Sequence, residues 1–567
     1  MIGISYCFSP QKVKLRINLS FFLFLALPFI YINSAENIFI RVNQVGFLPG
    51  DIKTAAVMSA GEIKGSEFII CGIQGNEALY KGYLKNGIKG EGKFRNIYII
   101  DFSDFRTPGK YMIKCGSVSS LPFSIGRDIY NGIADSLLLF FKVQRCGYTD
   151  PFLHGVCHIA DATSLVTGSL TTGVFPMAGH QDVTGGWHDA GDYVKFFNTT
   201  AFSTYMLLFS YEFDPVKFGF DSNHNAVPDI LEEAKVGLDW LLRAHLPNGK
   251  FVIQVQDLRD HAQGWRLPEE DKLTFDRPAF AGGGKNTIGM YCAVMALASR
   301  LWKEKLHYDE FANKCLSEAL RSYKMTSGMP EVDKSGSGMY LDSKPLGKMA
   351  LGALELFETT KEGRYLKDAV IYANEAKSDY WWSYGDINSL ADFRIAKYEP
   401  GIKDYLYFNL KNFNDLKNKS IFGQAASDTW GSNTAVMGAG LQAILWKRLT
   451  GKNDFDSLMT FQRDYMLGKN QWGVSFIYNI GKVFSKNFHS QVGYFRKGYL
   501  PGAVAAGPIS RKKLEGYKIK TNQIDPFREF QTESSVYQDM REDYVTNEPS
   551  ISTNATALFL IGYFAGK

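Results

Sequence analysis

The pattern of apolar and polar positions changes once along the chain, near Tyr130. Before it, short apolar runs from "NIFIRVNQVGF" to "LPFSIG" alternate with turns rich in Gly, Pro and Asp. This pattern predicts an antiparallel sandwich over residues 36–126. After it, longer runs such as "NTIGMYCAVMALASRLWKE" and "STNATALFLIGYFAG" follow the helical period. Paired runs of this kind over residues 127–567 predict a ring of helical hairpins, with functional residues on the loops at one end.

The first 35 residues carry a targeting pattern. A basic stretch ending at Arg16 precedes the apolar run of "LSFFLFLALPFIYINSAEN", which ends in small residues. This order is typical of a secretory signal cleaved near Ser34 or Ala35, and the run is short for a membrane span. We expect residues 1–35 to be a signal peptide and the protein to be secreted, periplasmic or at the cell surface. We expect no other membrane segment; an uncleaved anchor is the alternative.

Composition narrows the class of partner. The net charge is only +5, from 63 basic and 58 acidic residues, and the basic residues are dispersed. We therefore expect no nucleic-acid partner and no organic cofactor. Aromatic residues make up 14% of the chain, which fits either a large core or a surface that stacks on sugar rings. Seven cysteines are too few for a disulfide scaffold, although Cys71 and Cys115 either pair or remain free buried thiols.

The segment "GGWHDAGDYVKF" places Asp189 and Asp192 three residues apart. On a first helical turn both carboxylates project from one face. One interpretation is helix capping, which stabilises a helix by about 1 kcal/mol. The other is catalysis, because two like charges so close are costly unless they share a proton, a water or a cation.

A second acidic group lies near the C-terminus. Glu548 precedes Pro549, which disfavours a helical conformation at Glu548 and suits the first turn of the helix that follows. Glu548 is therefore predicted at a loop mouth before the last helix, with Asp539 and Tyr544 in the approach loop. A polar surface loop is the alternative.

These segments resemble glycoside hydrolase family 9, the family of many inverting cellulases. "GGWHDAGDYVKF" resembles its aspartate motif, and the C-terminal signature is matched by Tyr537, Asp539, Tyr544, Glu548, Ser550, Asn554 and Ala555. The signature between them is matched by Gly468, Asn470, Gly473, Ser475, Phe476 and His489. The resemblance covers about residues 130 to 567. "IFIRVNQVGFLPGDIKTAAV" also resembles the immunoglobulin-like domain of one branch of the family.

The resemblance implies a mainly α protein, an (α/α)6 barrel preceded by a small all-β immunoglobulin-like sandwich. It also implies hydrolysis of β-1,4-glucans with inversion, in which one carboxylic acid protonates the leaving oxygen and an opposing carboxylate activates water. By resemblance Glu548 is the acid, Asp192 the base, and Asp189 helps to orient the water. His489 and Asp539 are implied as active-site support.

Four residues are predicted to contact substrate. Trp430 and Trp472 are flanked by Gly and polar residues, which favours sugar platforms over core positions. Tyr544 lies in the loop before the acid. Gln491 stands where the family pattern usually carries arginine, a departure that bears on substrate contacts rather than on the acid–base pair.

Two metal sites are predicted. A Cys2His2 set suits tetrahedral zinc, and the alternative is a Cys146–Cys157 disulfide beside unrelated histidines. The resembling branch carries a structural zinc, which implies as ligands Cys146, Cys157, His158 and His188, with His154 and His180 as competitors. "DSNHNAVPDILEE" resembles a calcium loop through Asp221, Asn223 and Asn225. A turn with an Asp229–Glu232 capping box is the alternative.

The predicted function is an exported endoglucanase that acts on a β-glucan or related hemicellulose. Because no added binding module or docking segment is recognised, soluble polymers or oligosaccharides are favoured over crystalline cellulose. The alternatives are an exo-acting glycosidase on oligomers such as those of glucosamine, and an inactive sugar-binding homologue.

Overall fold

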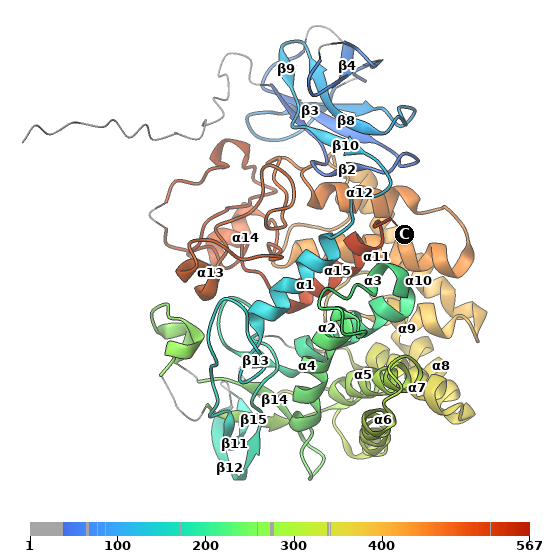
Figure 1. Ribbon diagram of the computed structural model, residues 1–567, viewed down its shortest axis with the longest axis vertical. Coiled ribbons are helices and arrows are strands. Elements are labelled where there is room, and N and C mark those ends of the chain that lie inside the picture. The colour runs from blue at the N-terminus through green and yellow to red at the C-terminus, as the bar shows by residue number, and fades with distance from the viewer. Residues whose placement is uncertain are drawn as a thin grey trace, which may run out of the picture. The chain divides into compact units, whose positions relative to one another are not determined.

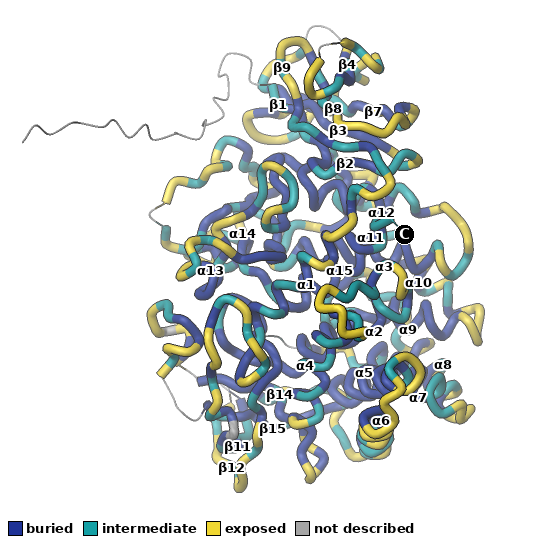
Figure 2. Tube along the Cα trace, viewed as in Figure 1, coloured by how far each residue is buried: buried dark blue, intermediate teal, exposed yellow. Residues whose placement is uncertain are grey.

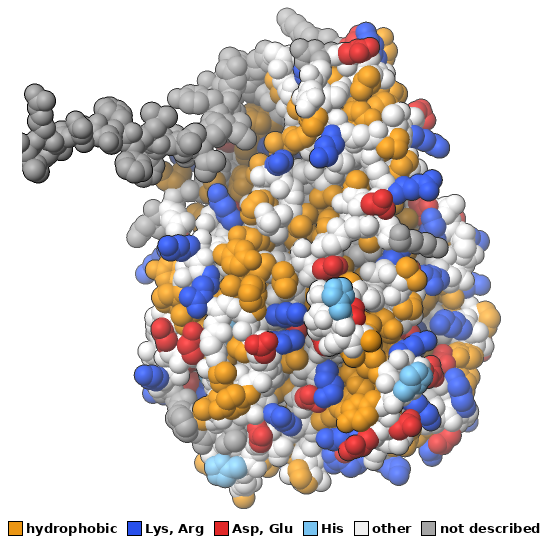
Figure 3. Space-filling view, viewed as in Figure 1, with side chains coloured by type: hydrophobic (Ala, Val, Ile, Leu, Met, Phe, Trp, Pro, Cys, Tyr) orange, Lys and Arg blue, Asp and Glu red, His pale blue; other side chains and the backbone are white. Residues whose placement is uncertain are grey.

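The computed structural model describes residues 38–566 except 64–66, 76, 86, 170–171, 258, 273–276, 337–339, 341 and 522. The predicted signal peptide lies outside the described residues. None of the helices in the described part of the chain combines the length and apolar character needed to span a bilayer. On the face drawn in Figure 3, basic and acidic side chains are interspersed, in line with the small net charge.

Short strands form two sheets between Ile38 and Ile125. One sheet has the antiparallel order β1-β3-β7-β6 and the other the order β2-β10-β8-β4-β5, with β9 on β8. The predicted sandwich is therefore present, but β2 and β10 pair in parallel. The bounds are β1 (Ile38–Arg41), β2 (Gly46–Phe47), β3 (Thr54–Ser59), β4 (Glu67–Gly72), β5 (Tyr80–Tyr83), β6 (Ile88–Lys89), β7 (Asn96–Asp101), β8 (Gly109–Cys115), β9 (Val118–Ser119) and β10 (Phe123–Ile125).

Six inner helices form a closed ring in which each packs against the next, in the order α2, α5, α7, α9, α11, α15 and back to α2. Their bounds are α2 (Phe197–Phe213), α5 (Lys285–Glu304), α7 (Pro345–Thr360), α9 (Asn388–Ile395), α11 (Ser432–Thr450) and α15 (Ile551–Gly562). Figure 1 shows α15, at the red end of the chain, alongside α1. This ring is the core of the predicted (α/α)6 barrel.

Each inner helix packs against one outer helix. For the first five inner helices this partner is the next long helix along the chain, and for α15 it is α1, the first helix. The outer helices are α1 (Ile133–Gln144), α4 (Asp229–Ala244), α6 (Asp309–Tyr323), α8 (Gly363–Ala376), α10 (Lys403–Lys419) and α12 (Asp456–Met466). The inner helices α2, α11 and α15 are buried on nearly every side, whereas α6 and α8 carry exposed stripes (Figure 2). A helix that is apolar all round needs this second layer.

Inner and outer helices alternate along the chain, so all six inner helices run in one direction. Their N-terminal ends therefore meet at one end of the barrel. Asp192 lies just before α2, Tyr340 before α7, Trp430 before α11 and Glu548 before α15. The ring thus brings distant segments of the chain to one site.

Several elements escaped the sequence pattern. A sheet of order β12-β11-β15-β14-β13 lies within the barrel domain. Its strands are β11 (Ala162–Ser169), β12 (Gly173–Asp182), β13 (Lys195–Phe196), β14 (Phe251–Val255) and β15 (Ala279–Gly282). Short helices α3 (Pro215–Phe218), α13 (Gln491–Phe495) and α14 (Arg511–Gly516) lie in the loops.

The β-sandwich is bonded to the barrel domain through buried polar side chains. Asn43 Nδ2 donates to Asp464 Oδ1 at 2.7 Å, and Gln44 Nε2 donates to the carbonyls of Gly473 and Val483, both at 3.0 Å. Because buried amides that lose such partners are costly, these bonds fix the sandwich on the barrel.

Close packing of α5 on α7 depends on a glycine. A Cβ at Gly289 would clash with the backbone of Lys348 and Met349. We expect Gly289→Ala to lower the free energy of unfolding by about 1–3 kcal/mol, as overpacked core positions do. Gly363→Ala, at a helical position where a Cβ meets nothing, is the control and should stay within about 1 kcal/mol. Denaturant unfolding followed by circular dichroism measures both, and equal stability of the two variants would contradict this packing account.

Candidate active site and metal centre

Asp189 and Asp192 lie in a tight turn before β13, whereas α2 begins only at Phe197. The expectation that both project from a first helical turn is therefore wrong, and neither caps α2. The turn is closed by its own hydrogen bonds. Val194 N donates to Asp192 Oδ1 at 3.1 Å, and Asp189 N donates to the Val194 carbonyl at 2.9 Å.

Gly191 joins this turn to two other loops. Its N–H donates to Glu548 Oε1 at 3.1 Å, and its carbonyl accepts from Gln491 N at 3.1 Å. A Cβ at this position would clash with the carbonyl oxygen of His489 and lie 3.0 Å from Glu548 Oε1. Only glycine therefore fits where the three loops meet, and the acid predicted from the sequence lies beside the predicted base.

Glu548 is held in a form suited to a proton donor. It precedes Pro549 and Ser550, and the Ser550 hydroxyl caps α15 by accepting from Thr553 N. Burial, followed by the charge of Asp192, raises the pKa of Glu548 well above its usual value. A raised pKa favours the protonated form, which a general acid requires.

Asp192 is shifted in the opposite direction. Burial alone would raise its pKa, but the hydrogen bond and charge of His261 lower it below the usual value. His261 Nε2 lies 2.6 Å from Asp192 Oδ2. The pKa values of Asp192 and Glu548 are therefore shifted in opposite directions, which is the division that acid–base hydrolysis of a glycoside needs.

Asp189 is a buried carboxylate with unused acceptors. It is 1% exposed, and neither of its oxygens has a hydrogen-bond partner of good geometry among the described residues. Burial raises its pKa to about 7, and the nearby hydroxyls of Thr199 and Tyr340 limit the rise. Buried polar atoms without partners are rare and mark a place for water or ligand.

His489 and Asp539 support the acid. His489 Nδ1 lies 2.8 Å from the Arg541 carbonyl, so Nδ1 carries the proton and Nε2 is a free acceptor. Burial lowers the pKa of His489, which keeps it neutral. Asp539 Oδ1 accepts from Asn487 N at 2.9 Å and from Asn547 Nδ2 at 3.2 Å. Asp539 thereby ties the loop of His489 to the residue before Glu548.

The two tryptophans predicted to contact substrate lie in different environments. Trp430 is 42% exposed and its ring packs against Tyr544 and Tyr517, which fits an exposed aromatic wall. Trp472 is 2% exposed and its indole N–H donates to Gln531, so its ring belongs to the core and is no sugar platform.

Gln491 makes a contact within the protein. It is buried, and its Oε1 accepts from the main-chain N–H of Arg266 at 3.0 Å. The residue that departs from the family pattern is therefore used to fasten the loop of residues 259–271.

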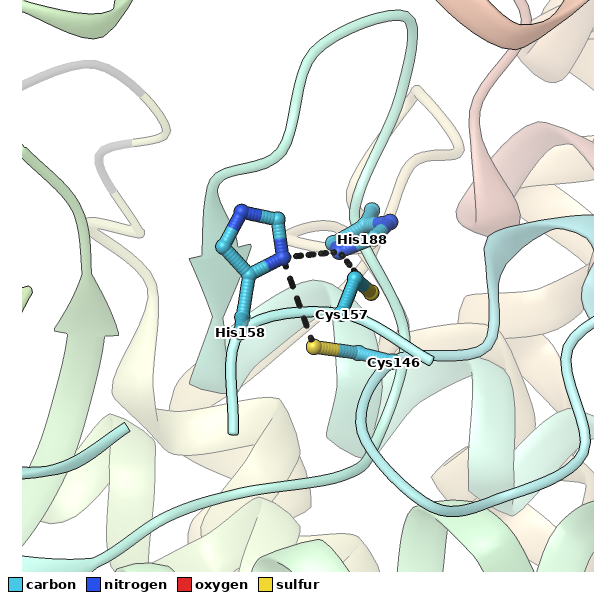
Figure 4. A group of neighbouring side chains, drawn as sticks. All are labelled: Cys146, Cys157, His158 and His188. Carbon is cyan, nitrogen blue, oxygen red and sulfur yellow. Dashed lines mark hydrogen bonds between the residues drawn. The ribbon is translucent and has the colours of Figure 1, made fainter. Parts of the chain in front are cut away.

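Cys146, Cys157, His158 and His188 converge, with all four ligand atoms within 4.8 Å of one another (Figure 4). Cys146 Sγ lies 3.9 Å from His158 Nδ1, Cys157 Sγ lies 3.8 Å from His188 Nε2, and the two nitrogens are 3.2 Å apart. A tetrahedral zinc with bonds of about 2.0–2.3 Å needs ligand atoms about 3.3–3.8 Å apart. The donor set and spacing therefore fit zinc.

Three of the four groups have the chemistry of metal ligands, whereas the hydrogen bond with Cys146 raises the pKa of the Cys157 thiol. Burial lowers the pKa of His188 to about 4, so it is neutral. Although burial opposes it, the hydrogen bond with Cys157 holds the pKa of Cys146 well below its usual range, in the thiolate form that binds metal. His158 Nε2 faces Asp271 Oδ2 at 3.3 Å, which directs Nδ1 to the cluster.

The alternatives for this site do not match the structure. Cys146 and Cys157 are free rather than joined in a disulfide. Both ring nitrogens of His154 face main-chain carbonyls at 2.9 Å, and His180 lies exposed on β12. Neither competitor belongs to the cluster.

In the predicted calcium loop, protein donors already occupy the oxygens. Asp221 Oδ2 accepts from Ala226 N at 2.9 Å, and Asn225 Oδ1 accepts from Val227 N at 2.9 Å. Asn223 Nδ2 donates to Glu232 at 3.0 Å. The alternative capping box is absent as well, since α4 has no side-chain cap.

Sequence reasoning missed three residues of the site. Tyr340 and Thr199 flank Asp189, and His261 bonds Asp192, yet none of them lies in a recognised motif. Trp265, which packs on His489, offered a weak signal because it follows Gly264 in a polar loop.

A ring of paired helices with two carboxyls of oppositely shifted pKa at one end is an arrangement suited to acid–base chemistry. Residues 130–561 match the protein-family model for glycosyl hydrolase family 9. Residues 35–120 match the protein-family model for the cellulase N-terminal ig-like domain. The chain therefore belongs to glycosyl hydrolase family 9. The predicted fold class and the prediction of an inverting glycoside hydrolase are confirmed.

Similar proteins cover nearly the whole chain. Endoglucanase D of Acetivibrio thermocellus is 24% identical over 93% of this chain and 83% of its own length. The cellodextrinase of Butyrivibrio fibrisolvens is 26% identical over 92% and 98%. Among solved structures, a Zn-binding triple mutant of a family 9 endoglucanase has a TM-score of 0.77 at 25% identity, over 91% of this chain and 99% of its own.

The contact at Gly191 yields a prediction. We expect Gly191→Ala to lower the rate of hydrolysis on the order of 100-fold, because a Cβ forces the base turn away from Glu548. Gly264→Ala, where a Cβ meets nothing, should keep full activity. Initial rates with matched circular dichroism spectra test this. Wild-type activity in a folded Gly191→Ala enzyme would show that the close contact is not needed.

Proposed function

We propose that this protein is an endo-acting glycosidase that cleaves β-1,4-glucosidic bonds in cellulose-like glucans or related hemicelluloses. One observation carries the proposal: Glu548, whose pKa is raised, is bonded to the main chain of Gly191, the residue directly before Asp192, whose pKa is lowered. The relatives support the substrate class, since they include endoglucanases, a cellodextrinase and a xyloglucan-specific endo-beta-1,4-glucanase of Bacteroides ovatus.

In this mechanism Glu548 donates its proton to the glycosidic oxygen as the bond to the anomeric carbon breaks. Asp192 takes a proton from water, and that water attacks the anomeric carbon from the opposite face. The product is inverted. The unpartnered oxygens of Asp189 supply acceptors for the same water. After turnover Glu548 is deprotonated and Asp192 is protonated, so Asp192 releases a proton to solvent and Glu548 takes one up.

Exposed and half-buried aromatic rings near the acid supply the sugar contacts. Trp430, Tyr517 and Tyr544 form one wall, and Trp265 packs against His489 beyond Tyr544. Aromatic faces of this kind stack on the apolar faces of glucose rings. The free Nε2 of His489 is placed to accept from a sugar hydroxyl.

Zinc is the metal that we propose for Cys146, Cys157, His158 and His188. When bound, it supplies four bonds that hold the segment of residues 146–158 to the turn of His188, directly before Asp189. No proton transfer passes through it. The calcium loop of residues 221–225 and export directed by residues 1–35 stay predictions.

The catalytic roles can be tested by exchange of single carboxyls. We expect Asp192→Asn and Glu548→Gln each to lower kcat at least about 1,000-fold, because each removes a proton acceptor or donor. The exposed pair Asp309→Asn and Glu310→Gln on α6 changes the same groups and should retain wild-type kcat. Rates on a soluble β-1,4-glucan measure this. Undiminished rates in either catalytic variant would overturn its assignment.

The mode of attack can be read from the products. We expect a panel of soluble β-1,4-glucans, xyloglucan and glucosamine oligomers to give mixed oligosaccharides early from the glucans, with inverted anomers in proton NMR spectra. Monomer alone from the first minutes identifies an exo-acting enzyme. A retained anomer contradicts the mechanism, and binding without hydrolysis identifies an inactive homologue.

The metal assignment predicts one zinc per chain by mass spectrometry of the purified enzyme. Cys157→Ser should lose the metal and lower the melting temperature, because the buried ligands lose a common partner. His180→Ala, which changes an exposed histidine outside the cluster, should keep both. A metal-free wild-type enzyme that is as stable as the zinc-loaded one would overturn the assignment.

A further inference from the structure

His261 lies far from Asp192 along the chain but touches it in space. It belongs to the loop of residues 256–271, between β14 and β15. Its Nε2 is 2.6 Å from Asp192 Oδ2, a short bond of the kind formed when one partner is charged. Nothing in the sequence motifs requires a histidine at this place.

The two oxygens of Asp192 are held separately. Oδ2 is bonded to His261, and Oδ1 accepts from Val194 N at 3.1 Å. Two bonds to two different oxygens fix the plane of the carboxylate. Each oxygen retains a further lone pair, so the carboxylate can still accept from water.

The proton of His261 is placed toward Asp192. Gln256 Nε2 lies 3.1 Å from His261 Nδ1, and Gln254 Nε2 donates to Gln256 Oε1. This orientation of the Gln256 amide makes Nδ1 the acceptor. In the neutral and in the protonated ring alike, Nε2 therefore carries a proton that faces the base.

The loop that carries His261 is fastened near the base by Arg266. The main-chain N–H of Arg266 donates to Gln491 Oε1 at 3.0 Å, and its carbonyl accepts from the Tyr193 hydroxyl. Its guanidinium bonds Asp271 at 2.8 Å and also Asp260. These anchors hold His261 in reach of Asp192.

We propose that His261 is a positioning residue for the catalytic base: it holds Asp192 Oδ2 so that the ionised carboxylate keeps a fixed orientation toward the attacking water. The proposal rests on the role of Asp192 as base proposed above. It assigns His261 a part in the reaction.

Substitution of His261 shifts the pH dependence of kcat/KM in a defined direction. His261 lowers the pKa of Asp192, and Asp192 must be ionised to act as a base. Removal of the His261 side chain therefore raises this pKa and moves the acid limb of kcat/KM to higher pH. The other charged or titratable groups around the pair are Asp189, Asp260, Tyr340, His489 and Glu548. They are the same in wild type and variant, so the shift reports His261.

The test compares His261→Ala and His261→Gln with wild type on one soluble β-1,4-glucan across pH. We expect His261→Ala to lower kcat on the order of 10- to 100-fold, with KM changed about twofold or less, and to raise the acid limb. His261→Gln, whose amide also donates an N–H, should recover much of kcat. Gln263→Ala, two residues further on the same loop and exposed, is the control and should behave as wild type.

Three outcomes overturn the proposal. The first is an unchanged kcat and an unchanged acid limb in His261→Ala. The second is a raised kcat, which would mark His261 as an obstruction. The third is a fall in stability and rate while the acid limb stays where it is in wild type. Asp192→Asn is measured beside them. If it stays active, the base assignment fails and the proposal with it; if it is inactive, a failure concerns His261 alone.

Discussion

One backbone contact, at Gly191, determines how the active site is assembled. Its N–H holds the acid Glu548, its carbonyl holds the loop of Gln491, and its missing side chain leaves room for the backbone of His489. Three segments that are distant in sequence therefore meet at a point where no other residue fits. The relative position of base and acid is set by main chain rather than by flexible side chains, which is the preorganisation that acid–base catalysis needs.

Burial and the dipoles of the inner helices both act on the ionisation of the acidic side chains near Gly191. Asp192 and Glu548 both lie before the N-terminal ends of parallel inner helices, whose dipoles favour negative charge. Burial outweighs that preference at Glu548, while His261 reinforces it at Asp192. Tyr193, next to the base, packs against both histidines of the metal cluster. The metal centre and the catalytic turn thus share one packed unit.

The sequence predicted those features that depend on the residues within one segment of the chain. The helical periods and the Asp192 and Glu548 motifs were readable from residue type and spacing, and the family resemblance pointed to the four side chains that converge in the Cys2His2 cluster. The helical placement of the aspartates and the role of Trp472 were not readable, since burial depends on the whole ring. His261 could not be found either, because its partner lies across a loop that carries no motif.

Closure of the helical ring has a consequence for the order of folding. The helix that follows Glu548 packs against α1, α2 and α11, so its contacts span most of the chain. Contacts between residues so far apart form late, after more local pairs such as α5 and α6. Until this helix docks, the turn of Asp192 lacks the bonds that Glu548 and Ile551 make to it, so the turn is complete only when the ring closes.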